Sequence, residues 1–577
     1  MNVDDLSKSL KKFKIIDQIV FGSMLGVCSV IGLYFGYQDL KRKRASKNDN
    51  EVLNFLMGGR KMKVFPVAMS LIASLVSGIL LLGASTEIYL YGTQYVYIII
   101  AIIISAVILD LIMIPVFHKL QITSVYEYLQ LRFDKKMRLF GSLMYTISSI
   151  LWLPIVLYVP ALAFNQMTSI NIHKITPIVM AVCLFYCSLG GMKAVVYTDF
   201  IQIIIMYGTL IVIAIKGTIN VGGFLNVIEI NLEGKRFEAP DFNLDPTTRH
   251  TFWTLVIGGA FLYIAHNALN QNMMQRYLAL RTVKEARKSN LIYAIGFIVI
   301  ILLCCYNGLL LYATYYNCDP LTTKLAMARD QMLPLLVMQT LNDIPGLSGF
   351  FIAGIFSASL SSISTGLNSM ACVILEDFVK PFRKKKLSET MCIVITRAVV
   401  LCFGLLGIAL VFVVQNLGTI LQLTLSVPTA CFGPLFGVFL IGFLFPWVNK
   451  RATLYSSVIG FIIMMTFVFK VQTEMALGHI KFSIKPMSTD GCDYEFNSTN
   501  LLPMTRISSS ASSIYQISYL YYTAIGCIMV VILSILLTFL LGYEDSSKIN
   551  QNLLAPFVRR KKEINEENNE NPFTNLQ

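Results

Sequence analysis

Hydroxyl side chains are concentrated in one apolar stretch, residues 345–377. Within it, residues 357–369 contain seven Ser or Thr and one Asn. One helical face carries residues i, i+3, i+4 and i+7. On this face the stripe is Ala358, Ser361, Ser362 and Thr365. A few hydroxyls in a membrane helix usually bond back to their own backbone, but this density exceeds that pattern. Hard cations bind oxygen ligands, so the stripe favours a sodium site that needs no full negative charge.

Two other apolar stretches carry small or polar residues at their centres. Residues 74–78 read SLVSG in the middle of 64–91, and 251–272 contains a Gly pair followed by His266, Asn267, Asn270 and Gln271. Polar groups at membrane depth are costly unless they face protein, water or a ligand, and unwound backbone is tolerated where it lines a cavity. Both stretches are therefore predicted to be broken helices, the alternative being small residues that only allow close helix packing.

Composition places all three stretches in a membrane protein. The chain has 577 residues, of which 55% are hydrophobic and 14% charged, against about 25% charged in ordinary soluble domains. The net charge of +14 would suggest nucleic acid for a soluble protein, but cytoplasmic loops of membrane proteins also collect Lys and Arg. A multi-pass membrane protein in a lipid bilayer, with no nucleic-acid partner, is the expected class.

A spanning helix needs about 20 apolar residues, and thirteen segments qualify. They are residues 15–37, 64–91, 94–117, 139–166, 174–190, 194–215, 251–272, 289–314, 345–377, 393–414, 418–446, 452–471 and 518–542. Five spans begin with the first broken one (64–215) and five with the second (251–446). An odd number per unit gives the two units opposite orientations, as in inverted repeats with discontinuous first helices.

The distribution of Lys and Arg over the loops predicts the orientation of the chain in the membrane. With the N-terminus outside, the cytoplasmic loops and tail hold about two-thirds of the 47 Lys and Arg, although residues 1–14 carry four Lys. The extracellular segments are then 1–14 and the loop 472–517, which contains the glycosylation acceptor Asn497. Cys318 and Cys492 also fall outside, where they either pair or stay free. The tail 543–577 is expected to be solvated and cytoplasmic, or to contact a scaffold protein.

The chain resembles the sodium:solute symporter family over about residues 15–545. The matching pieces are GGR at 58–60, LGGMKA at 189–194 with YTD at 197–199, NQ at 270–271 with QRY at 275–277, and SLSS at 359–362 with NS at 368–369. Its 55–83 and 87–92 segments look closest to the branch of sodium-coupled monocarboxylate, multivitamin and iodide transporters. The resemblance implies an all-α LeuT-type 5+5 inverted repeat, with one extra helix (15–37) before it and two (452–542) after it.

The resemblance also implies site residues. Sodium would bind the carbonyls of Ala73, Val76 and Ala358 and the hydroxyls of Ser361 and Ser362. Asp199 would act in sodium coupling or release, or be a helix-end charge at the cytoplasmic surface. The expected substrate contacts are Ser77, Gly78, Leu80, His266 and Asn270. An apolar Leu80, where sugar carriers place a polar residue, argues against a hexose, and His266 could instead be bonded within the bundle.

The expected activity is sodium-coupled symport of a small anion across the plasma membrane by alternating access, with sodium as the coupling ion and no cofactor. The candidate anions are a monocarboxylate, a vitamin carboxylate such as biotin or pantothenate, and iodide. Since no Arg or Lys is evident in the spans facing the pocket, helix-terminus N–H groups are expected to meet the anion. The alternatives are a carrier of a sugar, polyol or amino acid, and a transport-inactive sensor on the same fold. A channel fits less well, and an enzyme is not expected because no phosphate-loop, His-Glu-x-x-His or Cys-x-x-Cys pattern occurs.

Overall fold

The computed structural model describes residues 2–11, 13–45, 51–341, 343–385, 387–415, 420–480, 482–496 and 512–559. In these ranges every regular element is a helix, and one isolated bridge joins Asn2 to Glu495. The first half of the chain forms α1 Val3–Leu10, α2 Ile15–Ala45, α3 Glu51–Met57, α4 Val64–Leu75, α5 Gly78–Tyr91, α6 Ile98–Ile108, α7 Ile114–Leu120, α8 Glu127–Arg132, α9 Lys135–Thr168, α10 Ile172–Val221 and α11 Phe224–Glu233. The second half forms α12 Gly259–Ala268, α13 Gln271–Leu278, α14 Val283–Tyr315, α15 Met332–Thr340, α16 Leu347–Val373, α17 Glu389–Val414, α18 Ile420–Leu444, α19 Lys450–Ala476 and α20 Tyr522–Leu541.

Nine helices in the described ranges are long and apolar enough to cross a membrane, or ten if the bent pair α4 and α5 counts as one span. The helix α10 covers two of the thirteen expected spans. Its 50 residues would reach about 75 Å if straight, more than twice the hydrocarbon thickness. At Gly191 the backbone turns (φ 52°, ψ −148°), which divides α10 into two helices. The total of thirteen spans stays a prediction.

Both helices expected to be broken are interrupted where the polar residues lie. Between α4 and α5 the chain bends by 60°, with Val76 and Ser77 extended. Between α12 and α13 it is interrupted at Asn270, whose side chain accepts a hydrogen bond from the Asn272 amide and so starts α13. A short π-helical turn, η4 Thr254–Gly258, precedes α12.

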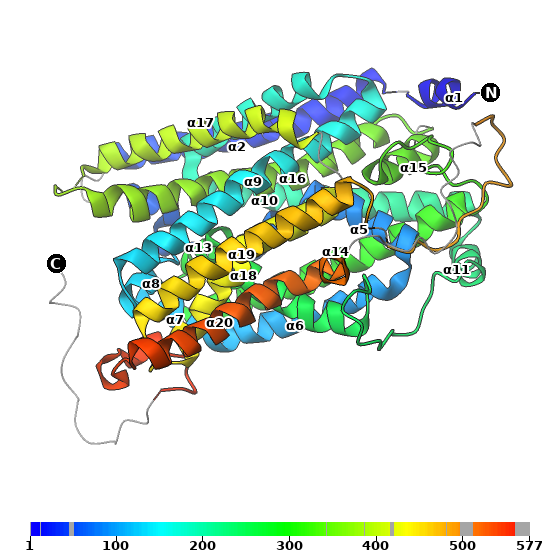
Figure 1. The fold of residues 1–577 in the computed structure, drawn as a ribbon. Coiled ribbons are helices and arrows are strands. Elements are labelled where there is room, and N and C mark those ends of the chain that lie inside the picture. The colour runs from blue at the N-terminus through cyan, green and yellow to red at the C-terminus, as the bar shows by residue number, and fades with distance from the viewer. Residues whose placement is uncertain are drawn as a thin grey trace.

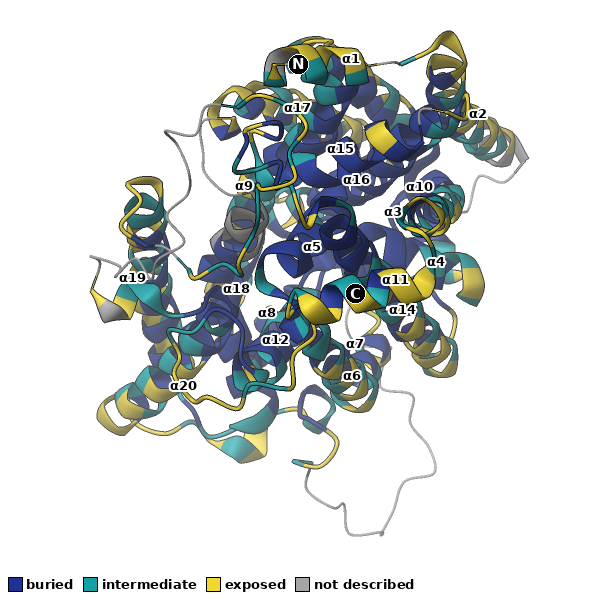
Figure 2. Ribbon diagram, turned by 90° about the vertical axis from the view of Figure 1, so that its right-hand side faces the viewer, coloured by how far each residue is buried: buried dark blue, intermediate teal, exposed yellow. Residues whose placement is uncertain are grey.

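The helix α16 lies at the centre of the bundle and packs against α10, α9, α2 and α17 (Figure 1). Its most apolar window is 94% buried, against 28% for α17, which lies at the periphery. Figure 2 shows the same contrast, with α16 in the buried interior and exposed residues on the outer helices. A helix buried on all sides does not need hydroxyls to meet solvent, so the Ser and Thr residues of α16 serve contacts inside the protein.

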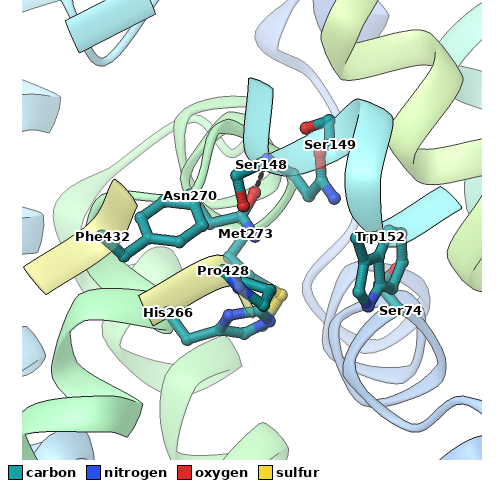
Figure 3. Close-up of a pocket in the computed structure, with 10 residues that line it drawn as sticks. Ser74, Ser148, Ser149, Trp152, His266, Asn270, Met273, Pro428 and Phe432 are labelled. Carbon is teal, nitrogen blue, oxygen red and sulfur yellow. Dashed lines mark hydrogen bonds between the residues drawn. The ribbon is translucent and has the colours of Figure 1, made fainter. Parts of the chain in front are cut away.

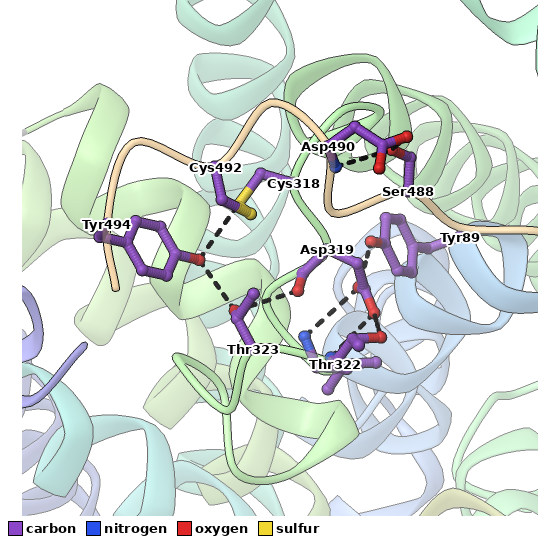
Figure 4. Close-up of a disulfide and its surroundings, with 10 residues drawn as sticks. Tyr89, Cys318, Asp319, Thr322, Thr323, Ser488, Asp490, Cys492 and Tyr494 are labelled. Atoms are coloured by element: carbon purple, nitrogen blue, oxygen red, sulfur yellow. Dashed lines mark hydrogen bonds between the residues drawn. A yellow bond between two sulfur atoms is a disulfide. The ribbon is translucent and has the colours of Figure 1, made fainter. Parts of the chain in front are cut away.

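A disulfide fastens the segment after α19 to the segment after α14. Cys318 and Cys492 are joined, and Asp319 next to the bridge accepts hydrogen bonds from Tyr89 of α5 and from Thr322 (Figure 4). The amide of Lys485 also donates to the carbonyl of Leu90. These contacts hold the segment 482–496 against the C-terminal end of α5.

Candidate functional site

The two hydroxyls at the centre of α16 bond to the end of α4. Ser361 Oγ donates to the carbonyl of Ala73 at 2.6 Å and to that of Ala358 at 2.9 Å. Ser362 Oγ lies 3.1 Å from the carbonyls of both Ser74 and Ala358. All five residues are buried. The chain thus brings two hydroxyls and three carbonyls, all uncharged oxygens, into one cluster where two helices meet.

The break in the helix is what makes these carbonyls available. The last carbonyls of any α-helix lack an intrahelical N–H partner, and α4 ends at Leu75. The Val76 amide bonds to Ile72, which leaves the next two carbonyls, those of Ala73 and Ser74, to accept from α16. Four of the five expected sodium ligands therefore belong to one cluster. The Ser74 carbonyl is an addition, and the expected ligand Val76 lies in the break itself, at the C-cap of α4.

Oxygen atoms of this kind fit an alkali cation. Hard cations prefer oxygen, and a hydroxyl that rotates its proton away can offer a lone pair instead. In the described residues no group of three or more His, Cys, Asp or Glu could hold another type of metal ion. The oxygen cluster is the candidate cation site.

Asp199 forms a buried ion pair with Arg276. The Arg276 guanidinium is 3.1 Å from Asp199 Oδ2, and both side chains have at most 1% exposure. Ser70 of α4 joins them, donating to Asp199 and accepting from Arg276, each at 2.6 Å. The reading of Asp199 as a helix-end charge at the surface is therefore wrong. The buried Arg276 was not expected; Asp199 supplies its counter-charge in the core, so Arg276 can remain charged there.

The ion pair is continuous with the oxygen cluster. Arg276 donates to Thr365 Oγ1, and that hydroxyl donates to the Ser361 carbonyl at 2.6 Å. Ser74 Oγ lies 3.0 Å from the same Thr365 oxygen. One hydrogen-bonded chain thus joins α10, α13 and α16 to the end of α4. The sequence signal for it was present in the QRY motif at 275–277, but nothing in the spacing paired Arg276 with Asp199.

A small cavity of about 20 Å³ lies beside the two breaks (Figure 3). It is lined by Ser74, Ser148, Ser149, Trp152, His266, Asn270, Asn272, Met273, Pro428 and Phe432. Of the expected substrate contacts, His266 and Asn270 line it, whereas Ser77, Gly78 and Leu80 do not. Gly78 instead packs against α16, where an added Cβ would lie 2.9 Å from Ser359 Oγ. The volume admits about one water molecule, so the cavity is nearly closed in this conformation.

The lining is amphipathic. Trp152, Pro428 and Phe432 give apolar walls, while Ser148, Ser149 and Asn270 give neutral polar groups. The N-terminus of α13 borders this cavity through Asn270, Asn272 and Met273, and helix N-termini favour negative charge. None of the ten lining residues is Lys or Arg. The cavity suits a small solute with an apolar body and a polar or anionic end.

A second buried ion pair, which the sequence did not reveal, joins α5 to the segment that precedes α12. Arg249, just before α12, lies 2.5 Å from Glu87 of α5 and stacks on Tyr91. His250 lies 3.4 Å from the same carboxylate, and burial lowers its pKa to about 4. His250 is therefore neutral at ordinary pH, and Arg249, with Arg329 nearby, balances Glu87.

Two expected features lie outside the described residues. The glycosylation acceptor Asn497 and the last part of the tail, residues 560–577, both fall there.

Comparison with known proteins gives a consistent result. The model of the sodium:solute symporter family matches residues 55–460. The sodium-coupled monocarboxylate transporter 2 of Mus musculus is 35% identical over 558 residues, covering 95% of this chain and 87% of that protein. The sodium/iodide cotransporter of Homo sapiens is 33% identical over 563 residues, covering 93% and 85%. A solved structure of a Na⁺-coupled sialic acid symporter has a TM-score of 0.73 at 22% identity, covering 93% of this chain and all of that one.

Proposed function

Because the chain belongs to the sodium:solute symporter family, we propose that it is a sodium-coupled symporter that moves a small anion across the plasma membrane by alternating access. The observation that carries this proposal is the cluster of uncharged oxygens between the end of α4 and the centre of α16. Relatives that cover most of this chain are named for sodium-coupled monocarboxylate and iodide transport.

The architecture proposed for this activity has thirteen spans in a 5+5 inverted repeat. The breaks after Leu75 and at Asn270 lie in the first helix of each repeat, which supports the assignment. The segment 482–496 and residues 543–559 lie at opposite ends of the bundle (Figure 1), as an extracellular loop and a cytoplasmic tail would. An extracellular N-terminus is proposed as well, supported by the bridge between Asn2, the N-cap of α1, and Glu495 in that segment.

Sodium entering from outside would bind among the carbonyls of Ala73, Val76 and Ala358 and the hydroxyls of Ser361 and Ser362. Each hydroxyl would turn its proton away from the carbonyls and present a lone pair to the ion. The bound ion would hold α4 against α16, as the hydrogen bonds do now. This exchange of hydrogen bonds for ion contacts leaves sodium binding weak enough to reverse.

Asp199 and Arg276 would take part in coupling and release. The pair reaches the oxygen cluster through Thr365, so movement of α4 or α13 away from α16 would disturb the pair and the cluster together. Breaking a buried ion pair costs several kcal/mol, and this makes the closed arrangement a discrete state.

The substrate would be a small anion: a monocarboxylate, a vitamin carboxylate or iodide. The N-terminal amides of α13 would meet the negative charge, with Asn270 and His266 beside it and Trp152 against the apolar part. A neutral solute is the second candidate, favoured by the absence of Lys and Arg among the ten lining residues.

Energetics limit the stoichiometry. A tenfold sodium gradient is worth about 1.4 kcal/mol, and each net charge moved adds about 2.3 kcal/mol per 100 mV. One sodium ion with one monovalent anion moves no net charge and gains nothing from the potential. Strong accumulation of an anion therefore requires two or more sodium ions per cycle.

Uptake in oocytes tests the proposal. Labelled lactate, nicotinate, biotin, pantothenate, iodide, glucose and proline are supplied in sodium and then in choline medium, with surface expression measured for each batch. Sodium-dependent uptake of one anion is the expected result. Sodium-dependent uptake of glucose or proline alone would establish the neutral-solute candidate instead. Sodium-independent uptake would refute symport.

A further inference from the structure

The chain after α20 folds back onto the bundle. Residues 543–559 follow the last helix, and the apolar run at 553–558 in this segment begins with Leu553, Leu554 and Ala555. All three are at most 4% exposed. We call residues 549–559 the C-terminal strap. Burial of these three residues, in contrast to the exposed Phe557, shows that this part of the strap is docked on the bundle.

Specific hydrogen bonds fix the position of the strap. Tyr128 of α8 donates its hydroxyl to the Leu553 carbonyl at 3.0 Å, and the Ala555 amide donates to Phe443 of α18 at 3.1 Å. Lys119 of α7 donates to Asn552 at 2.8 Å. Tyr128 is fully buried, so loss of the strap would leave its hydroxyl without this partner.

These contacts connect α7 on one side with α8 and α18 on the other, and they add to the direct packing of Phe117 of α7 on Tyr128 and Phe443. The helix α7 contacts α13 and α14, which belong with the second broken helix, whereas α8 precedes α9 and contacts α18. The helix α9 in turn packs on α16 and α17. The strap spans from Lys119 on the first side to Tyr128 and Phe443 on the second. It lies at the end of the bundle that holds α7 and α8, which the distribution of Lys and Arg makes cytoplasmic (Figure 1).

We infer that the C-terminal strap is a cytoplasmic clamp, which holds the inner side of the protein closed and must loosen before that side opens. The inference rests on the proposed alternating access, since opening requires the α13–α14 side to move against the α9–α16 side. Any change that releases the strap would then promote opening of the inner side and so alter the rate of transport.

Cys372 reports opening without any substrate. It is a buried thiol at the inner end of α16, bonded to Gln271 at the start of α13 and facing the carbonyl of Thr123 before α8. Separation of α13 from α16 would expose it to the cytoplasm. Its modification by a membrane-impermeant maleimide in inside-out vesicles, followed by peptide mass spectrometry, measures the open fraction.

Two truncations form the matched pair. Deleting residues 549–577 removes the strap, and deleting residues 560–577 leaves it. We expect Cys372 to react about tenfold faster in the first than in the second, a change equivalent to about 1.4 kcal/mol. Equal rates in the two truncations would overturn the inference.

A milder variant keeps the test possible if the longer deletion misfolds. If the longer deletion does not reach the membrane, Tyr128→Phe with Lys119→Met removes two of the strap's hydrogen bonds and keeps the aromatic packing of position 128 on Phe443. Its Cys372 is expected to react faster than that of the full chain, and an unchanged rate would refute the clamp. Because labelling needs no substrate, failure of the uptake panel leaves this result standing, and the reverse also holds.

Discussion

Removal of one hydroxyl from α16 is the sharpest test of the sodium site. Ser361→Ala deletes the oxygen that bonds to Ala73 and Ala358, and Ser362→Ala deletes the one that bonds to Ser74 and Ala358. Each substitution takes away one of five candidate ligands. Neither changes the backbone, and both leave the carbonyls in place.

The expected size follows from the strength of contacts to charged groups. A hydrogen bond to a charged group contributes about 1.5–3 kcal/mol, and we take an ion–hydroxyl contact to be of that order. Loss of 1.4 kcal/mol weakens binding tenfold, so each single variant should need at least roughly ten times more sodium for half-maximal transport. The double variant should show no saturation at ordinary sodium concentrations.

The assay is substrate uptake as a function of sodium, with choline as replacement and surface protein measured by biotinylation. Ser359→Ala is the matched control. Ser359 lies on the same helix, is equally buried, and its Oγ has no hydrogen-bond partner among the described residues. A sodium dependence in the double variant equal to that of Ser359→Ala, at equal surface level, would refute the assignment of the site.

Three further predictions concern the surroundings of the site. Asp199→Asn leaves Arg276 buried without its counter-charge, so the melting temperature in detergent should fall by the equivalent of about 3–5 kcal/mol; an unchanged value would show that the pair is not needed for stability. Gly191→Ala places a Cβ 2.6 Å from the Phe55 carbonyl at a positive φ and should abolish surface expression, whereas Gly22→Ala, with nothing within 4 Å, should be tolerated; equal expression would contradict the turn. Burial raises the pKa of Asp330 to about 6, against partial compensation by Arg329, so stability should fall as pH rises from about 4 to 6. Asp330→Asn should flatten that decline and raise the free energy of unfolding at pH 7 by at most about 3 kcal/mol. A pH profile of calorimetric stability that runs parallel to that of the unsubstituted protein would contradict this prediction.

Much of the fold was readable from local sequence. Apolar length predicted where helices cross, and the small polar residues at 74–78 and the Asn at 270 predicted both breaks, because these features act within one helix. The single helix α10 was expected as two spans, and the structure shows why both descriptions hold, since only a glycine turn separates its halves.

The site was readable only in part. Ser361 and Ser362 were expected to lie beside the end of the first half-helix, and Ser361 bonds to Ala73 while Ser362 bonds to Ser74, since the family's motifs mark both segments. The partnership of Asp199 with Arg276 was missed, because it joins residues 77 positions apart through packing that no periodicity encodes. Ser77, Gly78 and Leu80 do not line the cavity seen here, where Gly78 faces α16, and their contact with substrate stays a prediction.

Under the proposed function, the buried ion pair would link the uncharged candidate cation site to a charge. The oxygen cluster carries no formal charge, so sodium brings one positive charge into the bundle. Asp199 is already balanced by Arg276, and that balance depends on α13 staying beside α10. In the proposed cycle, movement of α13 would take Arg276 away from Asp199, which would remain connected to Ser70 of α4. An unbalanced carboxylate near the inner end of the helix would then attract the departing sodium ion. Release would therefore be drawn toward the cytoplasm by the same movement that opens the path.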